Sequence, residues 1–281
     1  MFFKRNQKKK NRRMPKKILA AVMAGLMILM PFQSNASTAA SKIVTPSSLV
    51  SKSTNEDIVR VTVNGSKGKR TFRVFAQGGS FNSKRSFVAL HGCAVCSLTT
   101  VLSGYTTKYQ NYTPAKTYKK LEKQVFGQRR WNANYKKSMS AQRPISLYGI
   151  SKVLSYCHVS NKYVRYFKDA KAIKQIENHL KKGEAVIVEV NNRRQKNGRI
   201  ISSYTSKWSS SKHTMVLLGM TNTGKVIVAD SAYRKWSGSR QRVKFTTMKQ
   251  LVSYMIPCTR SSSSVYYNSV ASCGGYILVN P

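Results

Sequence analysis

Acidic side chains are scarce in this sequence of 281 residues, which has 8 Asp and Glu against 50 Lys and Arg. Histidine is also rare, with four residues. Protein metal centres are built mostly from carboxylates, imidazoles and thiolates, and the His and Cys spacings here match no standard zinc pattern. The sequence therefore predicts no metal and no other cofactor.

The formal net charge of +42 draws the chain toward anionic polymers such as wall polymers, acidic lipids or nucleic acid. No motif of sequence-specific nucleic-acid recognition accompanies this charge. Lys and Arg are spread along the chain, which favours a generally basic surface over a dedicated binding patch. Association with an anionic cell-wall polymer stays open as a partner.

Apolar runs long enough to span a membrane are lacking near the N-terminus. Residues 1–17 carry nine basic groups and no acid, and the apolar run Ile18–Met30 that follows has thirteen residues. A membrane-spanning helix needs about 20. With Ser34-Asn35-Ala36 as a cleavage site, 1–36 is predicted to be a secretory signal peptide, and a membrane anchor is the alternative. Met14 is a second candidate start of translation.

Removal of residues 1–36 leaves 41 basic and 8 acidic residues, so the formal net charge falls to +33. No transmembrane span is expected in this mature chain, and the predicted location is secreted or associated with the cell wall. Residues 37–57 are rich in Ser and Thr and are interpreted as a linker. The folded domain is expected over 58–281.

Five cysteines remain in the mature chain, and disulfides persist outside the cell. Because five is odd, at least one thiol stays free or pairs between chains. Cys258 and Cys273 bracket a Ser-rich stretch and are expected to be bridged, and Cys157 is the expected partner of Cys96. Cys93 is then the free thiol.

The order of elements predicts an α+β fold rather than a parallel doubly wound sheet. Alternating apolar residues and an Asn-Gly turn predict a hairpin at the start of the domain. No internal repeat is found. Helices are expected at 93–105, 113–126, 146–157, 169–183 and 245–255, and strands at 185–190, 213–220, 225–230 and 274–280.

Cys93 begins a segment whose apolar residues fall at helical offsets, with Gly104 near its end. The N-terminus of a helix lowers the pKa of a thiol, and the thiolate is the reactive form of cysteine. A cysteine that simply packs the helix is the alternative.

His213 begins one strand of the late hairpin, and Asp230 ends the next strand, 17 residues on. Antiparallel neighbours joined by a short turn bring these two positions together. An imidazole can take the proton of a thiol and return it to a leaving amine, and a carboxylate can orient that imidazole. Cys93, His213 and Asp230 are therefore the candidate catalytic residues.

Three stretches resemble the bacteriocin-processing, papain-like cysteine peptidases and their C39-like relatives. GCAVCSLTTVLSGY is similar to their GCGPTSLAMVLSYL-type segment, KKGEAVIVEV to LxxGxPVIVxV, and SKHTMVLLGM…KVIVADSA to GHFVVLTGY…KVYVADPA. The resemblance covers roughly residues 70–255. It implies a papain-like fold and hydrolysis of peptide bonds, with Cys93 as nucleophile, His213 as base and Asp230 as orienting carboxylate.

The chain departs from this pattern at two places. Ala94-Val95-Cys96 stands where the family has Gly-Pro-Thr, and Phe87 stands where papain spacing puts the Gln of the oxyanion hole. Gln77, 16 residues before Cys93, is the nearest upstream Gln and the candidate for that role. Family members are often fused to transporters, and this chain is expected to be a free-standing secreted relative that acts on a peptide or protein.

Two other function classes remain open. FVAL-HG-CAVC is interpretable as a strand, a loop and a C-x-x-C at a helix start, the arrangement of a thiol–disulfide oxidoreductase. A non-catalytic, basic binding module on a degenerate peptidase fold is the other alternative. Within the enzyme interpretation, peptidoglycan stem peptides and acyl transfer through the same thioester are also open.

Overall fold

The computed structural model divides the chain into two units, 1–40 and 41–281, and every residue described belongs to the second. The predicted signal peptide and all of the predicted linker except Asp57 lie outside the described residues. Within the described part, no helix is long and apolar enough to cross a membrane. The structure describes residues 57–65, 68–78, 88, 92–126, 146–191, 208, 212–232, 242–257 and 274–280.

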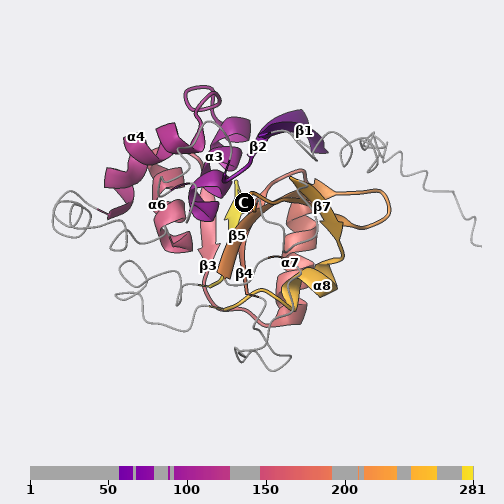
Figure 1. Ribbon diagram of the computed structural model, residues 1–281. Helices are drawn as coiled ribbons and strands as arrows, with labels where there is room; N and C mark the ends of the chain where they lie inside the picture. Colours follow the sequence, from indigo (N-terminus) through magenta and orange to yellow (C-terminus); the bar gives the residue numbers. More distant parts are fainter. Residues whose placement is uncertain are drawn as a thin grey trace, which may run out of the picture. The chain divides into compact units, whose positions relative to one another are not determined.

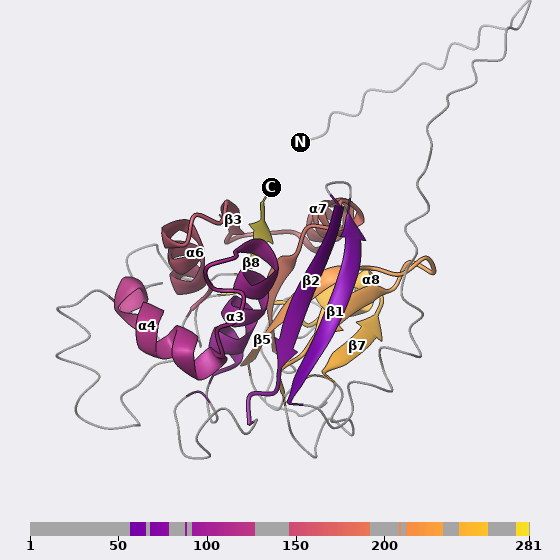
Figure 2. The same cartoon turned by 90° about the horizontal axis from the view of Figure 1, so that it is seen from above.

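The domain begins with the predicted hairpin, formed by β1 (Ile58–Gly65) and β2 (Gly68–Phe75). The strands pair antiparallel from Ile58 opposite Phe75 to Gly65 opposite Gly68. Figure 2 shows the hairpin lying alongside α3 (Cys93–Tyr105). Valines at alternate positions of β1 are buried, because successive side chains of a strand point to opposite faces.

Among the described residues, the hairpin is followed by the helices α3, α4 (Pro114–Phe126) and α6 (Leu147–Tyr156), which Figure 1 shows close together. The side chains that directly precede α4 and α6 cap these helices. Thr113 Oγ1 accepts a hydrogen bond from Lys116 N at 3.3 Å, and Ser146 Oγ accepts one from Gly149 N at 3.1 Å. Each cap pairs a backbone N–H that has no partner within its helix.

A six-stranded antiparallel sheet forms the rest of the domain, in the order β3-β8-β4-β5-β6-β7. The strands expected late in the chain are confirmed, whereas β3 was not predicted. The bounds are Asn161–Val164 for β3, Val186–Asn191 for β4, Lys212–Met220 for β5, Val226–Ala229 for β6, Val243–Thr246 for β7 and Tyr276–Val279 for β8.

Two helical predictions need correction. The last expected helix is only α8 (Met248–Val252), because Phe245 and Thr246 pair with β6 as part of β7. The helix expected over 169–183 is α7 (Asp169–Lys181), and Lys168 occupies the cap position, so Asp169 is the first helical residue. An acidic residue in the first turn still stabilises the helix through its dipole.

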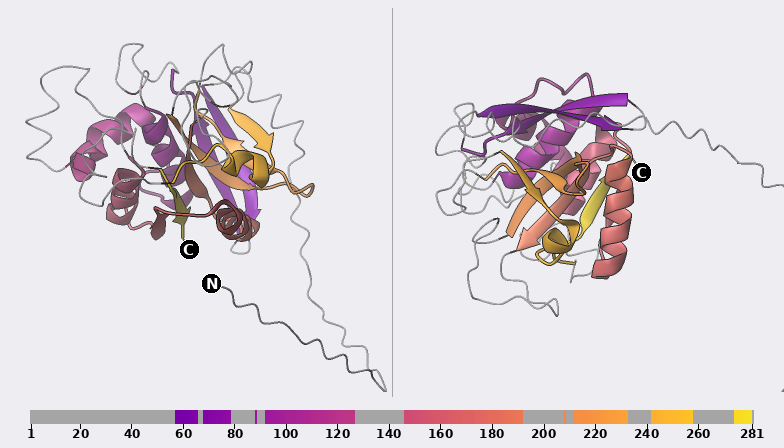
Figure 3. Two further views of the ribbon diagram at one scale, coloured as in Figure 1. Left: turned by 90° about the horizontal axis from the view of Figure 1, so that it is seen from below. Right: turned by 90° about the vertical axis from the view of Figure 1, so that its right-hand side faces the viewer.

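The sheet separates two hydrophobic clusters, because alternate residues of its strands face opposite sides. Ile187 and Val216 face the cluster that contains α3, α6 and the hairpin. Val188 and Met215 face the cluster that contains α7 and α8. Figure 3 shows α7 and α8 on the side of the sheet away from the hairpin. Helices packed on an antiparallel sheet make an α+β fold, as predicted.

A buried carboxylate ties the hairpin to the body of the domain. Glu184 is 2% exposed, and its two oxygens accept hydrogen bonds from Arg70 Nη1 (3.0 Å), Tyr105 Oη (2.7 Å) and Asn280 Nδ2 (3.0 Å). Tyr105 Oη also accepts the hydrogen bond of Ala185 N at 2.8 Å. We call these residues the Glu184 network. A buried charge that lost these partners would be strongly destabilising.

The hairpin turn approaches the end of α7 as closely as backbone allows. A Cβ on Gly65 would lie 2.6 Å from Lys182 O and 2.9 Å from Gly183 Cα. Gly183 has a φ of +76°, which side chains rarely adopt, and it ends the helix as predicted. Glycine at both positions lets the Glu184 network form beside this contact.

Removal of the Tyr105 hydroxyl tests this network. Tyr105→Phe leaves the buried N–H of Ala185 without its acceptor and Glu184 without one donor, which costs about 2 kcal/mol of the free energy of unfolding. The melting temperature should fall by roughly 4–8 °C for a domain of this size. Tyr156→Phe is the control, since Tyr156 is 52% exposed. Equal melting temperatures for the two variants would contradict the role of the network.

Candidate active site

Cys93 is the first residue of α3 and is partly buried. The residue before it, Gly92, has its N–H 3.0 Å from Val88 O. A Cβ on Gly92 would lie 2.4 Å from that oxygen, so only glycine fits directly before the cysteine. Val88 is helical, so at that residue the FVAL run is not the strand that the oxidoreductase interpretation needs. Because Cys93 is the first residue of the 13-residue helix α3, its thiol lies at the positive end of the helix dipole.

His213 and Asp230 are in contact at the ends of neighbouring strands. β5 and β6 pair from Met220 opposite Val226 to Val216 opposite Ala229. This register leaves His213, near the start of β5, and Asp230, just after β6, at the same end of the two strands. There His213 Nε2 lies 2.7 Å from Asp230 Oδ1. The histidine is 4% exposed and the aspartate 0%.

The structure also brings Cys93 to His213, with a side-chain hydrogen bond between thiol and ring. Because Nε2 of the ring faces Asp230, Nδ1 is the nitrogen directed at the sulfur. The cysteine helix is held to the histidine strand by Ser97 Oγ, which donates to Thr214 O at 3.1 Å. Residues 120 positions apart in the sequence thus form one hydrogen-bonded row.

The charges along this row shift both ionisation equilibria. Burial would raise the pKa of Cys93, but the hydrogen bond and charge of His213, with hydrogen bonds to Thr214, lower it below its ordinary value. Burial would lower the pKa of His213, but Asp230 and Cys93 outweigh it and raise that pKa to about 10. The site therefore favours a thiolate beside an imidazolium near neutral pH.

Asp230 is held by more than the histidine. Its Oδ1 also accepts a hydrogen bond from Ala232 N (2.8 Å), and Lys244 Nζ donates to Oδ2 at 2.6 Å. Burial would raise the pKa of Asp230, but the charges of His213 and Lys244 hold it well below the usual range. Sequence analysis missed Lys244. The alternation of Val243, Lys244 and Phe245 was the available signal of a strand.

Gln77 follows β2 and is partly buried. Its backbone N–H donates to Ser231 O at 2.9 Å, one residue after Asp230. The chain after the hairpin therefore returns to the residue that follows the buried carboxylate. Phe87, the position given by papain spacing, lies outside the described residues. Gln77 as an oxyanion donor stays a prediction.

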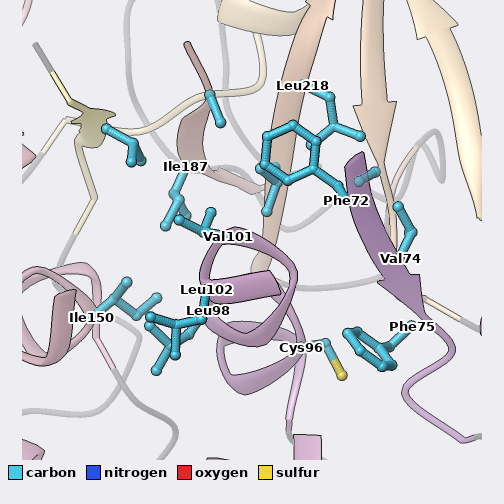
Figure 4. Close-up of a cluster of buried hydrophobic side chains, with 14 of the residues drawn as sticks. Phe72, Val74, Phe75, Cys96, Leu98, Val101, Leu102, Ile150, Ile187 and Leu218 are labelled. Carbon is cyan, nitrogen blue, oxygen red and sulfur yellow. The ribbon is translucent and has the colours of Figure 1, made fainter. Parts of the chain in front are cut away.

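The expected Cys96–Cys157 disulfide is wrong, because both cysteines are free thiols. Figure 4 shows Cys96 on the side of α3 next to Phe75 of β2, whereas Leu98 and Leu102 face Ile150 of α6. Cys157 ends α6, on that other side, and its pKa is raised to about 11, mainly by burial. The sequence did not show that Cys96 lies on the side of α3 away from α6, and the predicted pairing with Cys157 failed for that reason.

Cys96 has the properties of a core residue. It is 1% exposed, and burial, followed by the charge of Cys93, raises the pKa of its thiol well above the ordinary value. Cys93 and Cys96 are both free, so the C-x-x-C segment holds two thiols of opposite character. Cys258, Cys273 and His91 lie outside the described residues.

The remaining described histidines lie elsewhere in the fold. His179 is buried, and its Nε2 lies 2.9 Å from Val279 O, which ties α7 to β8. His158 follows α6 with a φ of +59°. Among the described residues, no three His, Cys, Asp or Glu side chains are grouped as metal ligands would be.

A thiol at the start of a helix, packed against an antiparallel sheet that carries a histidine, is an arrangement of papain-like cysteine peptidases. A profile of the Peptidase_C39 like family matches residues 72–256, about two thirds of the sequence. The chain belongs to this family, and the family and the fold together indicate a cysteine peptidase.

Comparison with solved structures finds the peptidase domain of Streptococcus ComA, described as a bi-functional ABC transporter involved in a quorum sensing pathway. It is 14% identical, covers 68% of this chain and 92% of that one, and gives a TM-score of 0.36. No curated protein sequence matches the chain.

The electrostatics of the site predict selective alkylation of Cys93. At about pH 6, an ordinary thiol is only about 0.3% ionised, whereas the contact with His213 lowers the pKa of Cys93 and so raises its thiolate fraction. Iodoacetamide followed by peptide mapping should label Cys93 at least about 100-fold faster than Cys157, and His213→Ala should remove most of this difference. Cys96→Ser is the control and should label as wild type does. Labelling of Cys93 only after addition of reductant would instead point to a Cys93–Cys96 disulfide.

Proposed function

We propose that the chain is a cysteine peptidase that hydrolyses a peptide bond through Cys93, His213 and Asp230. The observation that supports this most directly is the row in which Cys93 is hydrogen-bonded to the ring of His213, whose Nε2 lies 2.7 Å from Asp230 Oδ1. Each member has the chemistry that its role requires: a thiol of lowered pKa, an imidazole, and an ionised carboxylate.

In the first half of the reaction, the Cys93 thiolate adds to the carbonyl carbon of the scissile bond, and the carbonyl oxygen becomes an oxyanion. When the tetrahedral intermediate collapses, His213 gives its Nδ1 proton to the leaving nitrogen, and a thioester to Cys93 remains. Asp230 keeps Nε2 protonated and stabilises the imidazolium that precedes this transfer.

In the second half, neutral His213 takes a proton from water at Nδ1, and the hydroxide adds to the thioester carbon. Collapse releases the carboxylic acid and regenerates the thiolate beside the imidazolium. An acceptor amine in place of water would give acyl transfer with the same thioester. The ring must therefore alternate between charged and neutral forms in each turnover.

The oxyanion needs hydrogen-bond donors at the start of α3. A helix leaves its first N–H groups without intrahelical partners, and Cys93 is the first helical residue, so its own amide is one proposed donor. Gln77 is the proposed second donor. The hydrogen bond from Gln77 N to Ser231 O supports this role, because it brings the loop to the Asp230 side of the site.

We also propose that the enzyme is secreted and acts on a peptide or protein outside the cell. The predicted signal peptide and the charge of +33 without residues 1–36 support this location. A chain of that charge is attracted to an anionic wall polymer, which would concentrate it near its substrate. A stem peptide of the wall is one substrate that fits these conditions.

Substitution of the nucleophile and base tests the peptidase proposal. Cys93→Ser and His213→Ala should each abolish cleavage of a peptide that the wild type cuts, while circular dichroism and melting temperature stay close to wild type. Cys96→Ser should retain activity, whereas a thiol–disulfide oxidoreductase would lose it. A Cys93→Ser variant that still cleaves would sink the proposed role of this thiol, and a wild type that cleaves no peptide would favour the binding module.

Replacement of Gln77 tests the oxyanion donor. Gln77→Ala should lower kcat by roughly two orders of magnitude with little change in KM, the typical loss for one donor. Gln110→Ala is the control, because Gln110 is exposed and only its carbonyl oxygen contacts Arg73. An unchanged kcat for Gln77→Ala would assign the second donor to another group.

A further inference from the structure

Asp230 carries one negative charge between two basic side chains. Its Oδ1 lies 2.7 Å from His213 Nε2, and its Oδ2 accepts a hydrogen bond from Lys244 Nζ at 2.6 Å. The aspartate side chain is 0% exposed and the lysine side chain only 11%. Lys244 therefore reaches the proposed base, His213, only through Asp230, because the two basic side chains contact different oxygens of its carboxylate.

The sheet register places Lys244 at this oxygen. Lys244 of β7 is directly opposite Val228 of β6, and cross-strand partners point to the same face. Asp230 lies two residues after Val228, so its side chain is the diagonal neighbour of Lys244, within reach of a long side chain. The backbone is fixed at the same place, because Asp230 N donates to Arg242 O at 2.8 Å.

The lysine is directed by packing as well as by charge. Its Nζ lies 5.9 Å from the centre of the Trp208 ring, and Trp208 is 2% exposed. A cation near an aromatic ring within about 6 Å is attracted to it. An exposed surface ion pair contributes little, but this pair joins a partly buried lysine to a fully buried carboxylate that contacts the proposed base.

The ionisable groups around the carboxylate are few. His213 comes from β5, Lys244 from β7, Arg242 directly precedes β7, and Cys93 comes from α3 beyond the ring. Arg242 is turned toward Ala232 O, which its Nη1 contacts at 3.3 Å, and its charge acts on Cys96. Among these groups in the described part of the chain, His213 and Lys244 are the two whose charges hold Asp230 ionised.

We propose that Lys244 is a positioning residue of the reaction, which keeps Asp230 ionised and oriented while His213 alternates between its charged and neutral forms. This inference rests on the proposed peptidase function. The critical step is hydrolysis of the thioester, where the Cys93 charge is gone and His213 must be neutral to accept a proton from water. A buried aspartate alone would hold the imidazolium, whereas the positive charge of Lys244 opposes it and lets the ring lose its proton.

The direction of the effect follows from the charges. Loss of a positive charge near the imidazolium removes a repulsion, so the pKa of His213 in the thioester rises. The neutral base then forms only at higher pH. Lys244→Met should therefore move the acid limb of the kcat–pH profile to higher pH by about one unit, and lower kcat by about 10-fold at pH values on that limb.

The experiment uses the mature chain and a peptide ester, because alkoxide leaves readily and thioester hydrolysis then limits kcat. Lys244→Met is expected to show the shifted limb with kcat/KM, which reports formation of the thioester, within about twofold of wild type. Lys244→Arg, which keeps the charge, is expected to restore most of kcat. Lys225→Met is the matched control, since Lys225 is exposed before β6. A lysine that only braces β7 would lower kcat equally at every pH, and that result would overturn the inference.

A measurement without substrate separates this inference from the proposed function. In a Cys93→Ala background, NMR titration of the His213 ring should give a higher pKa with Lys244→Met than without it. If wild type hydrolyses the ester but Lys244→Met leaves the kcat limb and this titration unchanged, the lysine inference fails. If wild type hydrolyses neither ester nor peptide, the proposed function fails. Should Lys244→Met not fold, Lys244→Gln replaces it, because an amide removes the charge but keeps a donor.

Discussion

The fold at this site is organised around a carboxylate that has been taken out of water. Asp230 is fully buried, and an unpaired charge there would be strongly destabilising. The β5–β6 register brings His213 to one oxygen, β7 brings Lys244 to the other, and the amide of Ala232 adds a third donor. The ionisation of the cysteine follows from this arrangement, because the buried aspartate keeps charge on the ring that contacts Cys93. The electrostatics of the thiol are therefore set by strand pairing in a distant part of the sequence.

Local pattern was sufficient for much of this arrangement. The apolar runs on either side of the Thr-Asn-Thr-Gly turn predicted the β5–β6 hairpin, and the positions of His213 and Asp230 at its open end followed from antiparallel pairing. The start of α3 was also readable, because apolar spacing changes to a helical period at Cys93. In each case the information lies within about 20 residues, where spacing and geometry are directly related.

What sequence analysis missed depends on contacts between distant segments. Phe245 and its neighbours have a helical pattern, but pairing with Ile227 makes them a strand, and only that pairing reveals Lys244 as a partner of Asp230. The Cys96–Cys157 pairing was wrong for a similar reason, since the side of α3 that faces β2 is settled by packing against Phe75 (Figure 4). Strand β3 was missed because its four residues gain their order from β8.

The Glu184 network joins parts of the chain that are far apart in the sequence. Arg70 belongs to the first two strands of the domain and Asn280 follows the last, yet both donate to one buried carboxylate. Loss of the segment that carries Arg70, or of the one that carries Asn280, would leave the Glu184 carboxylate with fewer donors. The remaining segment would then be bound less tightly to the rest of the domain. The hairpin and β8 are thus expected to open as one cooperative unit, so a protein exposed to other proteases would resist stepwise trimming from its ends.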